Sequence, residues 1–416
     1  MPTIDLKYGR TSIPFEYEDP RFEILDGRGD RPPLSDVEIG YKLNDPIGTK
    51  TLEEIVGPGE NVLIVVPDAT RQAAAGQVVN LLVRRLIANG SLPSEITIIF
   101  ATGIHRKVSD DEKSEILTPF IAQRIKTLDH DPRDLARLVR LGETKGGIPI
   151  ELNRALVDHD HVVLVGGVSF HYFAGFTGGR KLVCPGLAST RTITATHKLA
   201  FDCNVRSRRE GVDTGLLDGN AVHEAFVEAV SKVRPAFSIN TFVNSNGEAT
   251  DLYCGDWIVS HRAACDDFIR ENMVEITEKR DLVIVSCGGS PHDINLIQAH
   301  KALEAASHAC NDGGTIVLLA ECGDGLGRDD FLNWFEAKES GALAERLCEK
   351  YQVNGQTAWN LLRKAERFEI RVVTSLDSDS LNKMRMKAET SFADRGQSRG
   401  YILTDGARTM VRTLSN

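Results

Sequence analysis

The sequence predicts an α/β fold of two domains, each with a largely parallel, doubly wound sheet and with the active site in the cleft between them. The chain has 416 residues, more than one domain usually holds. Short β-branched runs such as Val62–Val66 are apolar at consecutive positions, as strands buried on both faces are. Segments with helical periodicity separate many of these runs, which is typical of α/β proteins.

The elements follow in chain order. Residues 3–17 alternate apolar and polar around Gly9-Arg10, which predicts a hairpin at a sheet edge. We expect buried strands at Val62–Val66, Ile96–Phe100, Val162–Val165, Leu282–Val285 and Ile316–Leu319. Helical patterns cover 73–89, 111–126, 189–200, 219–232 and 294–309. The segment 401–410 is strand-like and can return to either sheet.

A charged segment at 266–280 separates two strand-helix series, and we place the domain boundary there. The expected domains are 1–270 and 271–402, with a C-terminal tail of about 403–416 that can return to the first domain.

Composition excludes several classes of protein. The net charge of -10 leaves no whole-surface basic footprint for nucleic acid or anionic lipid. The apolar runs are too short to cross a bilayer, and no signal-like segment opens the chain, so we expect a cytoplasmic protein with no nucleic-acid or membrane partner. The eight cysteines form no CxxC pair, which favours reduced thiols over disulfides or a zinc framework.

Two polar segments follow predicted strands directly. Asp68 and Arg71 come after the first strand, and His105 comes after the second. The carboxyl ends of parallel strands form one rim, where ligands bind. Arg71 suits a phosphate or carboxylate, although Asp68 could simply cap a helix and His105 could be a solvent-facing loop residue.

The segment Ser169–Lys181 is harder to explain as packing. It combines three glycines, four aromatic residues, a histidine and the cations Arg180 and Lys181. Such glycines allow a ligand to approach the backbone closely. The segment matches neither the Walker loop nor the Rossmann fingerprint. His197 follows sixteen residues after Lys181 on a predicted helix, where it is either a core histidine or a metal ligand.

In the second domain, Gln298 and Lys301 share a predicted helix face. An amide and an ammonium group there could grip a carboxylate, or could be a solvated flank. Residues 323–327 (GDGLG) form a second glycine-rich loop after a strand, which alone is weak support for a nucleotide site.

Together these motifs resemble the nickel-dependent lactate racemase family. The matching segments, in family order, are DATRQ at 68–72, TGIHR at 102–106, HYFAGFTGGRKLVCPG at 171–186, ATHKL at 195–199, and Gln298 with Lys301. The likeness extends over about residues 60–330. It implies that the first domain binds the cofactor and that the second closes over the substrate.

The resemblance implies a nickel-pincer nucleotide as cofactor, a pyridinium-3-thioamide-5-thiocarboxylic acid mononucleotide in which a ring carbon and two sulfurs bind Ni. Lys181 matches the lysine that is covalently attached to it, and His197 matches the protein ligand of the metal. Residues expected to line the cofactor are Asp68, Phe173, Gly178, Gly179 and Pro185. Cofactor-biosynthesis proteins are then expected in the cell.

In the same family His105 and His171 match the acid/base pair, and Arg71, Gln298 and Lys301 match the residues around the substrate carboxylate. Trp359 is the expected counterpart of a tryptophan near the substrate, ahead of Trp334. Two histidines suit the two enantiomers of the substrate. Its C2 hydride passes to the cofactor, and the planar 2-keto acid that results can accept the hydride on either face.

These residues predict a racemase acting on a small-molecule 2-hydroxy acid. We favour a short aliphatic, lactate-like substrate, because the motifs contain no surplus arginine for a second carboxylate. The alternatives are a larger 2-hydroxy acid (aryl, dicarboxylic or sugar acid) and a non-catalytic carrier of the nickel nucleotide. A carrier would not need both His105 and His171. A hydrolase or phosphotransferase lacks its GxSxG or Walker motif here.

Overall fold

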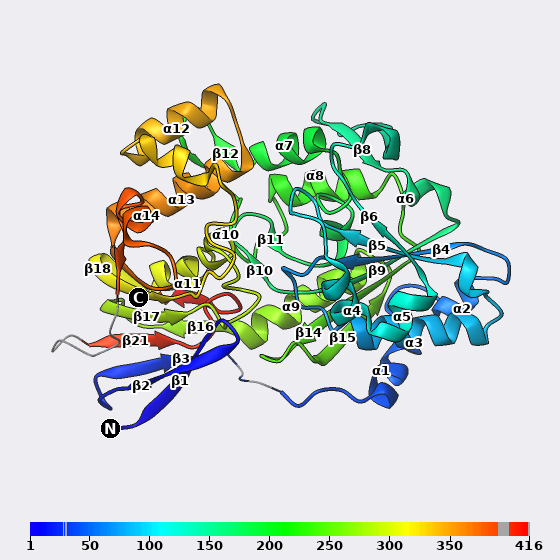
Figure 1. Ribbon diagram of the computed structural model, residues 1–416, viewed down its shortest axis with the longest axis horizontal. Coiled ribbons are helices and arrows are strands. Elements are labelled where there is room, and N and C mark those ends of the chain that lie inside the picture. The colour runs from blue at the N-terminus through cyan, green and yellow to red at the C-terminus, as the bar shows by residue number, and fades with distance from the viewer. Residues whose placement is uncertain (28, 30, 390–398, 415–416) are drawn as a thin grey trace.

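Two six-stranded sheets organise the chain, one in each lobe of the molecule (Figure 1). The computed structural model describes residues 1–27, 29, 31–389 and 399–414. Helices flank both sheets, which confirms the predicted α/β class.

The first sheet has the order β15-β14-β9-β4-β5-β6. Its strands are parallel except β15, which pairs antiparallel with β14. Their bounds are β4 Val62–Pro67, β5 Ile96–Ala101, β6 Lys126–Asp129, β9 His161–Gly167, β14 Phe237–Val243 and β15 Ala249–Gly255. The three runs that we expected here are confirmed, whereas β6, β14 and β15 were not anticipated.

Both faces of this sheet are covered, which explains the consecutive apolar residues. Ile64 of β4 packs in the core shared with α3, while Val65 packs in the opposite core with α8. The helices of this lobe are α1 Asp36–Leu43, α2 Leu52–Ile55, α3 Ala75–Ala88, α4 Asp110–Leu117, α5 Pro119–Arg124, α6 Ala155–Asp158, α7 Thr190–Lys198, α8 Ala221–Val230 and α9 Val259–Asn272. The single helix expected at 111–126 is wrong, because Thr118 has φ +71° and Pro119 starts a new helix.

The second sheet has the order β20-β19-β18-β17-β21-β3 and is parallel throughout. Its strands are β3 Phe22–Leu25, β17 Arg280–Ser286, β18 Cys310–Leu319, β19 Glu369–Val373, β20 Lys387–Ala388 and β21 Gly400–Leu403. The lobe's helices are α10 Leu296–Ala299, α11 Ala302–Ala309, α12 Ser340–Glu349, α13 Val353–Arg367 and α14 Ser378–Lys383. The helix expected at 294–309 is thus divided in two.

The N-terminal hairpin forms, but it covers a face of the second sheet instead of extending an edge. Strands β1 (Thr3–Tyr8) and β2 (Thr11–Glu16) pair with each other, and Leu6 and Phe15 pack on Ile284, Leu319 and Ile402. Since β3 also joins this sheet, residues 3–25 lie with the C-terminal half, although we expected them in a 1–270 domain.

The C-terminal segment touches both lobes. Strand β22 (Met410–Thr413) pairs in parallel with β16 (Met273–Ile276), outside the large sheets. Met410 packs on the Phe170–Phe268 cluster of the first lobe, and Val411 joins the core of the second. The last two residues of the expected tail, 415–416, lie outside the described residues.

One expectation about the cysteines is wrong. Cys203 and Cys348 form a disulfide, with their Cα atoms 5.6 Å apart, while the other six cysteines are free and buried. The sequence offered no sign of this pair because 145 positions separate its members. In the described part of the chain, no helix combines the length and apolarity needed to span a membrane.

Candidate active site

A cavity of about 1230 Å³ lies between the lobes. The first lobe contributes the ends of β4, β5 and β9 and the loops after them, and the second contributes α10, α13 and the loop after β18. Of the thirteen site residues predicted from the sequence, eleven line the cavity, and Gly179 and Trp359 do not. The lining residues are Asp68, Arg71, His105, His171, Phe173, Gly178, Lys181, Pro185, His197, Gln298 and Lys301.

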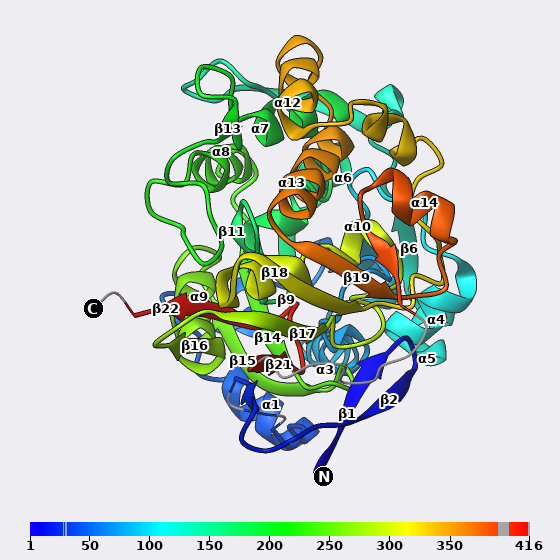
Figure 2. The same ribbon diagram turned by 90° about the vertical axis from the view of Figure 1, so that its left-hand side faces the viewer.

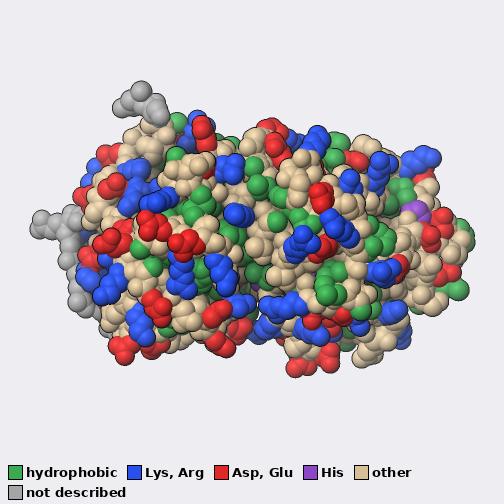
Figure 3. Space-filling view, turned by 90° about the horizontal axis from the view of Figure 1, so that it is seen from above, with side chains coloured by type: hydrophobic (Ala, Val, Ile, Leu, Met, Phe, Trp, Pro, Cys, Tyr) green, Lys and Arg blue, Asp and Glu red, His purple; other side chains and the backbone are tan. Residues whose placement is uncertain are grey.

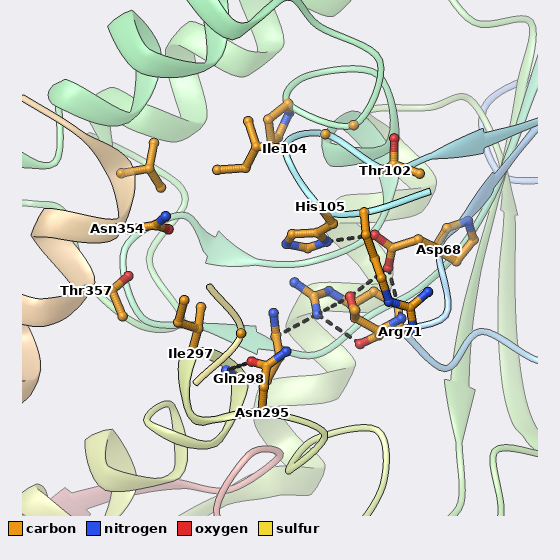
Figure 4. Close-up of a pocket in the computed structure, with 18 of the residues that line it drawn as sticks. Asp68, Arg71, Thr102, Ile104, His105, Asn295, Ile297, Gln298, Asn354 and Thr357 are labelled. Carbon is orange, nitrogen blue, oxygen red and sulfur yellow. Dashed lines mark hydrogen bonds and ion pairs between the residues drawn. The ribbon is translucent and has the colours of Figure 1, made fainter. Parts of the chain in front are cut away.

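His105 and Asp68 form the best-defined polar pair of the cavity. They follow β5 and β4, which are neighbours in the sheet, and His105 Nδ1 lies 2.7 Å from Asp68 Oδ2 (Figure 4). Burial opposes the charged form of Asp68, but His105, Arg71 and the Thr70 hydroxyl outweigh it and lower the pKa of this carboxyl to about 2. The carboxylate therefore accepts the Nδ1 proton of His105, which leaves Nε2 as an available base. The His105 side chain is 35% exposed.

His171 is held in a contrasting, aromatic environment. Its ring stacks on Tyr172 and meets Phe173 edge-on. Burial, together with the nearby charge of Lys181, lowers the pKa of His171 well below its ordinary value, so the ring is neutral. Nδ1 accepts long hydrogen bonds from the N–H groups of Phe173 (3.5 Å) and Ala174 (3.3 Å), which puts the proton on Nε2.

Lys181 and His197 lie against the same two aromatic rings. Lys181 Nζ is 5.7 Å from the centre of the Phe173 ring and 5.9 Å from that of Phe226. The His197 ring is 5.1 Å and 5.7 Å from the same two centres. Burial and neighbouring cations, Arg71 first, lower the pKa of Lys181 well below its usual value. The amine and the imidazole thus converge on one part of the cavity.

His197 presents a single free nitrogen. Its Nδ1 donates to the carbonyl of Ile193, one turn earlier in α7, at 2.8 Å. Burial, and then the charge of Lys181, lowers the pKa of His197 to about 3, so the ring stays neutral at pH 7. Fixing Nδ1–H on a backbone carbonyl leaves the Nε2 lone pair for a ligand, as is usual for metal-binding histidines.

Arg180 has a structural role instead of adding a second cation to the cavity. It is 1% exposed, and it donates to the carbonyl of Ala174 at 2.7 Å and to His223 Nδ1 at 3.0 Å. These bonds hold the backbone of the glycine-rich loop in place. Gly178 (φ +74°) and Gly179 (φ +46°) form its turn, and a Cβ on Gly179 would lie 2.6 Å from the His261 ring.

Arg71 and Lys301 approach from opposite lobes and share one acceptor. Gln298 Oε1 accepts from Arg71 at 2.9 Å and from Lys301 Nζ at 2.5 Å (Figure 4). Burial lowers the pKa of both cations. Two donors that converge on one oxygen between the lobes form a ready position for a carboxylate.

Helix α13 supplies the wall opposite His105. Asn354 and Thr357 face the cavity from this helix, with Ile104 and Ile297 near them (Figure 4). Thr357 Oγ1 is 3.4 Å from the hydroxyl of Tyr172. Trp359, which we expected near the substrate, instead packs edge-on against Phe201 in the core of the second lobe. Trp334 is also in that core.

Sequence reasoning missed several lining residues. Asn354 and Thr357 belong to none of the motifs, and Tyr172 lies within the motif at 171–186 but was not selected. His300 stands between Gln298 and Lys301, both of which were selected, and could have been noticed. His300 Nδ1 donates to the carbonyl of Ile297 at 2.7 Å, and its buried Nε2 has no partner among the described residues. The second glycine-rich loop reaches the cavity through residues 324–327.

Two models of known protein families match most of the chain. Residues 8–208 match the lactate racemase N-terminal domain, and residues 276–411 match the lactate racemase C-terminal domain. The chain belongs to the lactate racemase family. It is therefore an isomerase of the racemase type.

Individual relatives agree with this assignment. The lactate racemase of Thermoanaerobacterium thermosaccharolyticum is 31% identical over 355 residues, covering 84% of this chain and 82% of the relative. The lactate racemase of Lactiplantibacillus plantarum is 31% identical over 335 residues, covering 80% and 77%.

Solved structures show the same fold. The lactate racemase apoprotein from T. thermosaccharolyticum superposes with a TM-score of 0.87 at 26% identity, covering 99% of this chain and 100% of that one. A protein from Thermotoga maritima superposes with a TM-score of 0.74 at 20% identity, covering 92% and 100%, which supports the fold alone.

Proposed function

We propose that this member of the lactate racemase family racemises a 2-hydroxy acid with a nickel-pincer nucleotide attached to Lys181 and bound through His197. The observation that carries the proposal is the convergence of Lys181 and His197 on the Phe173 and Phe226 rings, in the cavity that also holds His105, His171 and the Arg71–Gln298–Lys301 cluster.

The residues present fit such a cofactor. Within the described ranges, no group of three or more His, Cys, Asp or Glu side chains could hold a metal ion. His197 Nε2 can donate one ligand, so a metal here needs its other ligands from a small molecule, as a pincer provides. When bound, this cofactor supplies a hydride acceptor and donor, which allows a 2-hydroxy acid to pass through a planar 2-keto acid.

Lys181 is prepared to form a covalent bond. Its lowered pKa favours the neutral amine, which has the lone pair that acylation of nitrogen requires. Phe173 and Phe226 provide an apolar contact for the side chain. Gly178 has a left-handed φ of +74°, and a Cβ there would lie 3.1 Å from the Gly167 carbonyl oxygen, so glycine allows the tight turn that lines the cavity beside Lys181.

His105 and His171 would handle the hydroxyl proton, one for each hand of the substrate. His105 is ready to accept a proton at Nε2, and the Asp68 carboxylate stabilises the resulting imidazolium. His171 carries its proton on Nε2 and acts as a base only after a change of tautomer.

Arg71 and Lys301 would bind the substrate carboxylate. Because both already donate to the amide oxygen of Gln298, a carboxylate that replaces this oxygen keeps their hydrogen bonds and neutralises charge. Gln298 can then turn and donate its own N–H to the carboxylate. This grip joins the two lobes and would fix C2 with respect to the histidines.

Lactate, or a similarly short aliphatic 2-hydroxy acid, is the first candidate substrate, since two relatives at 31% identity are named lactate racemases. A larger, polar 2-hydroxy acid is the second candidate. It is favoured by Asn354 and Thr357 in the wall and by three arginines that line the cavity in addition to Arg71, namely Arg106, Arg133 and Arg328. These arginines weaken the expectation that no surplus arginine is available, although Arg106 and Arg328 already pair with acidic residues.

Two measurements test the proposal. Protein co-produced with cofactor-making enzymes should show a covalent mass adduct that Lys181→Ala abolishes and that the exposed-lysine control Lys198→Ala retains. An unchanged mass for the wild type under those conditions would refute the attachment. Chiral chromatography of a panel of 2-hydroxy acids, from lactate to aryl, dicarboxylic and sugar acids, should reveal racemisation; a loaded enzyme inactive on the entire panel would refute the reaction.

A further inference from the structure

The segment from Phe201 to Arg208 forms an arm that reaches from the first lobe to the second (Figures 1 and 2). It is an antiparallel pair of short strands, β12 (Phe201–Asp202) and β13 (Ser207–Arg208). Phe201 packs edge-on against Trp359 of α13, with ring centres 5.0 Å apart. At the other strand, Arg208 donates to Glu304 of α11 at 2.8 Å.

The tip of the arm is bound to α12. Cys203 forms the disulfide with Cys348, and Arg206 pairs with Glu345 at 2.6 Å. The ion pair is exposed on both sides, so it contributes little to holding the arm. The disulfide is therefore the strongest connection at the tip.

This connection joins two segments that adjoin the two walls of the cavity in sequence. On one side, the arm follows α7, the helix of His197, within a few residues. On the other side, α12 precedes α13, the helix of Asn354 and Thr357. Joining the arm to α12 thus limits how far these two helices can separate.

Cys203 and Cys348 also differ from the other cysteines in accessibility. Cys203 is exposed and Cys348 is partly exposed, whereas the six free cysteines are buried. Burial raises the pKa of Cys184, Cys254, Cys310 and Cys322 to about 12, which disfavours their reactive thiolates. A dissolved thiol or disulfide would therefore react at the arm first.

We propose that Cys203 and Cys348 are a reversible thiol–disulfide modification site that tethers the two walls of the cavity. The expected compartment is reducing, and there disulfides are usually transient and serve redox sensing or catalysis. The proposal concerns the movement of the lobes and does not depend on the cofactor or on the substrate.

The chemistry requires a low-molecular-weight disulfide as oxidant. The Cys203 thiolate attacks one of its sulfurs, forming a mixed disulfide and releasing one small thiolate. The Cys348 thiolate then attacks the Cys203 sulfur, closing the protein disulfide and releasing the second small thiolate. Two electrons pass from the cysteines to the oxidant, and the two cysteine protons end on the released thiols. A dithiol reverses both steps.

The test compares the full chain after treatment with glutathione disulfide and after treatment with dithiothreitol. Non-reducing peptide mapping should recover a Cys203–Cys348 peptide only from the oxidised sample. Hydrogen exchange in residues 201–208 and in α12 should be about tenfold faster after reduction, because the tip can then open locally. Complete alkylation of both thiols after oxidation would overturn the proposal, and so would equal exchange in a sample shown to be linked.

Variants separate the tether from general destabilisation. Cys203→Ser with Cys348→Ser should exchange at the faster rate under both treatments, and Arg206→Ala should keep the redox response because it removes only the ion pair. Loss of the response in Arg206→Ala would contradict the proposal. If the double serine variant fails to fold, the wild-type comparison still decides, since it needs no substitution.

Discussion

The two walls of the cavity hold their polar groups in different ways. In the first lobe, His197 is fixed by a backbone carbonyl and His171 by backbone N–H groups. In the second lobe, Gln298 and Lys301 bond mainly to each other and to Arg71 across the cavity. The groups suited to chemistry are thus fixed by backbone hydrogen bonds within one lobe, while those suited to gripping a substrate depend on how the lobes meet.

Removing either of the two histidines expected to transfer protons, His105 or His171, should cause the largest loss of activity. His105→Ala and His171→Ala should each lower kcat by about 10²- to 10⁴-fold, because proton transfer at the hydroxyl loses its base. His159→Ala is the control, since its ring bonds to the carbonyl of Ala155 away from the cavity. Racemisation should be followed from both enantiomers by chiral chromatography. Full activity of both alanine variants would contradict the two-base assignment.

Changes to the second wall should act on binding. Gln298→Ala and Lys301→Ala each remove a partner of the carboxylate, so kcat/KM should fall by about 10- to 100-fold, mostly through KM, as expected for one charge-assisted hydrogen bond. Steady-state kinetics with the best substrate of the panel measure this. A fall in kcat with no change in KM would place these residues in the chemical step and remove the distinction between the walls.

Acid should destabilise the first wall through its buried histidines. The pKa of His197 is about 3, lower than in the unfolded chain, so the unfolded state binds more protons below about pH 6.5. The free energy of unfolding should therefore fall with falling pH, by about 1 kcal/mol per pH unit for each such histidine between pH 6 and pH 4. His197→Asn keeps a donor for Ile193 and should reduce this slope in urea titrations. An unchanged slope would contradict the neutral imidazole.

The smallest effect is expected at the far wall. Thr357→Val keeps the shape of the side chain and removes its hydroxyl. The preference for a 2-hydroxy acid with a distal hydroxyl over its deoxy analogue should fall by about three- to tenfold, the usual contribution of one neutral hydrogen bond. Thr357→Ser is the matched control and should retain the preference. An equal preference in all three proteins would exclude Thr357 from substrate selection.

The sequence predicted the parts of the fold and of the site that depend on local pattern. The consecutive apolar residues of β4 identify a strand covered on both faces, and the rim position of His105 follows from its place after β5. Where a side chain turns is harder to predict. Trp359 and Thr357 stand two positions apart on α13, and only tertiary packing sends the tryptophan into the core and the threonine to the cavity.

Pairings over long sequence distances were missed for a similar reason. Nothing near Cys203 indicates Cys348, and nothing in the alternation of residues 3–17 says that the hairpin covers a sheet made by the other end of the chain. The distribution of charge on the surface gives little help in predicting these pairings. On the face shown in Figure 3, acidic and basic side chains are interspersed over both lobes.

The position of β3 has a consequence for biosynthesis. Residues 22–25 pair with residues 400–403, so the first strand of the second sheet to leave the ribosome lacks its neighbour until nearly the entire polypeptide has been made. The hairpin before it must likewise wait for β17 and β18. The second lobe thus matures only after translation is almost complete, while the first lobe, whose sheet strands all lie between residues 62 and 255, can fold during elongation.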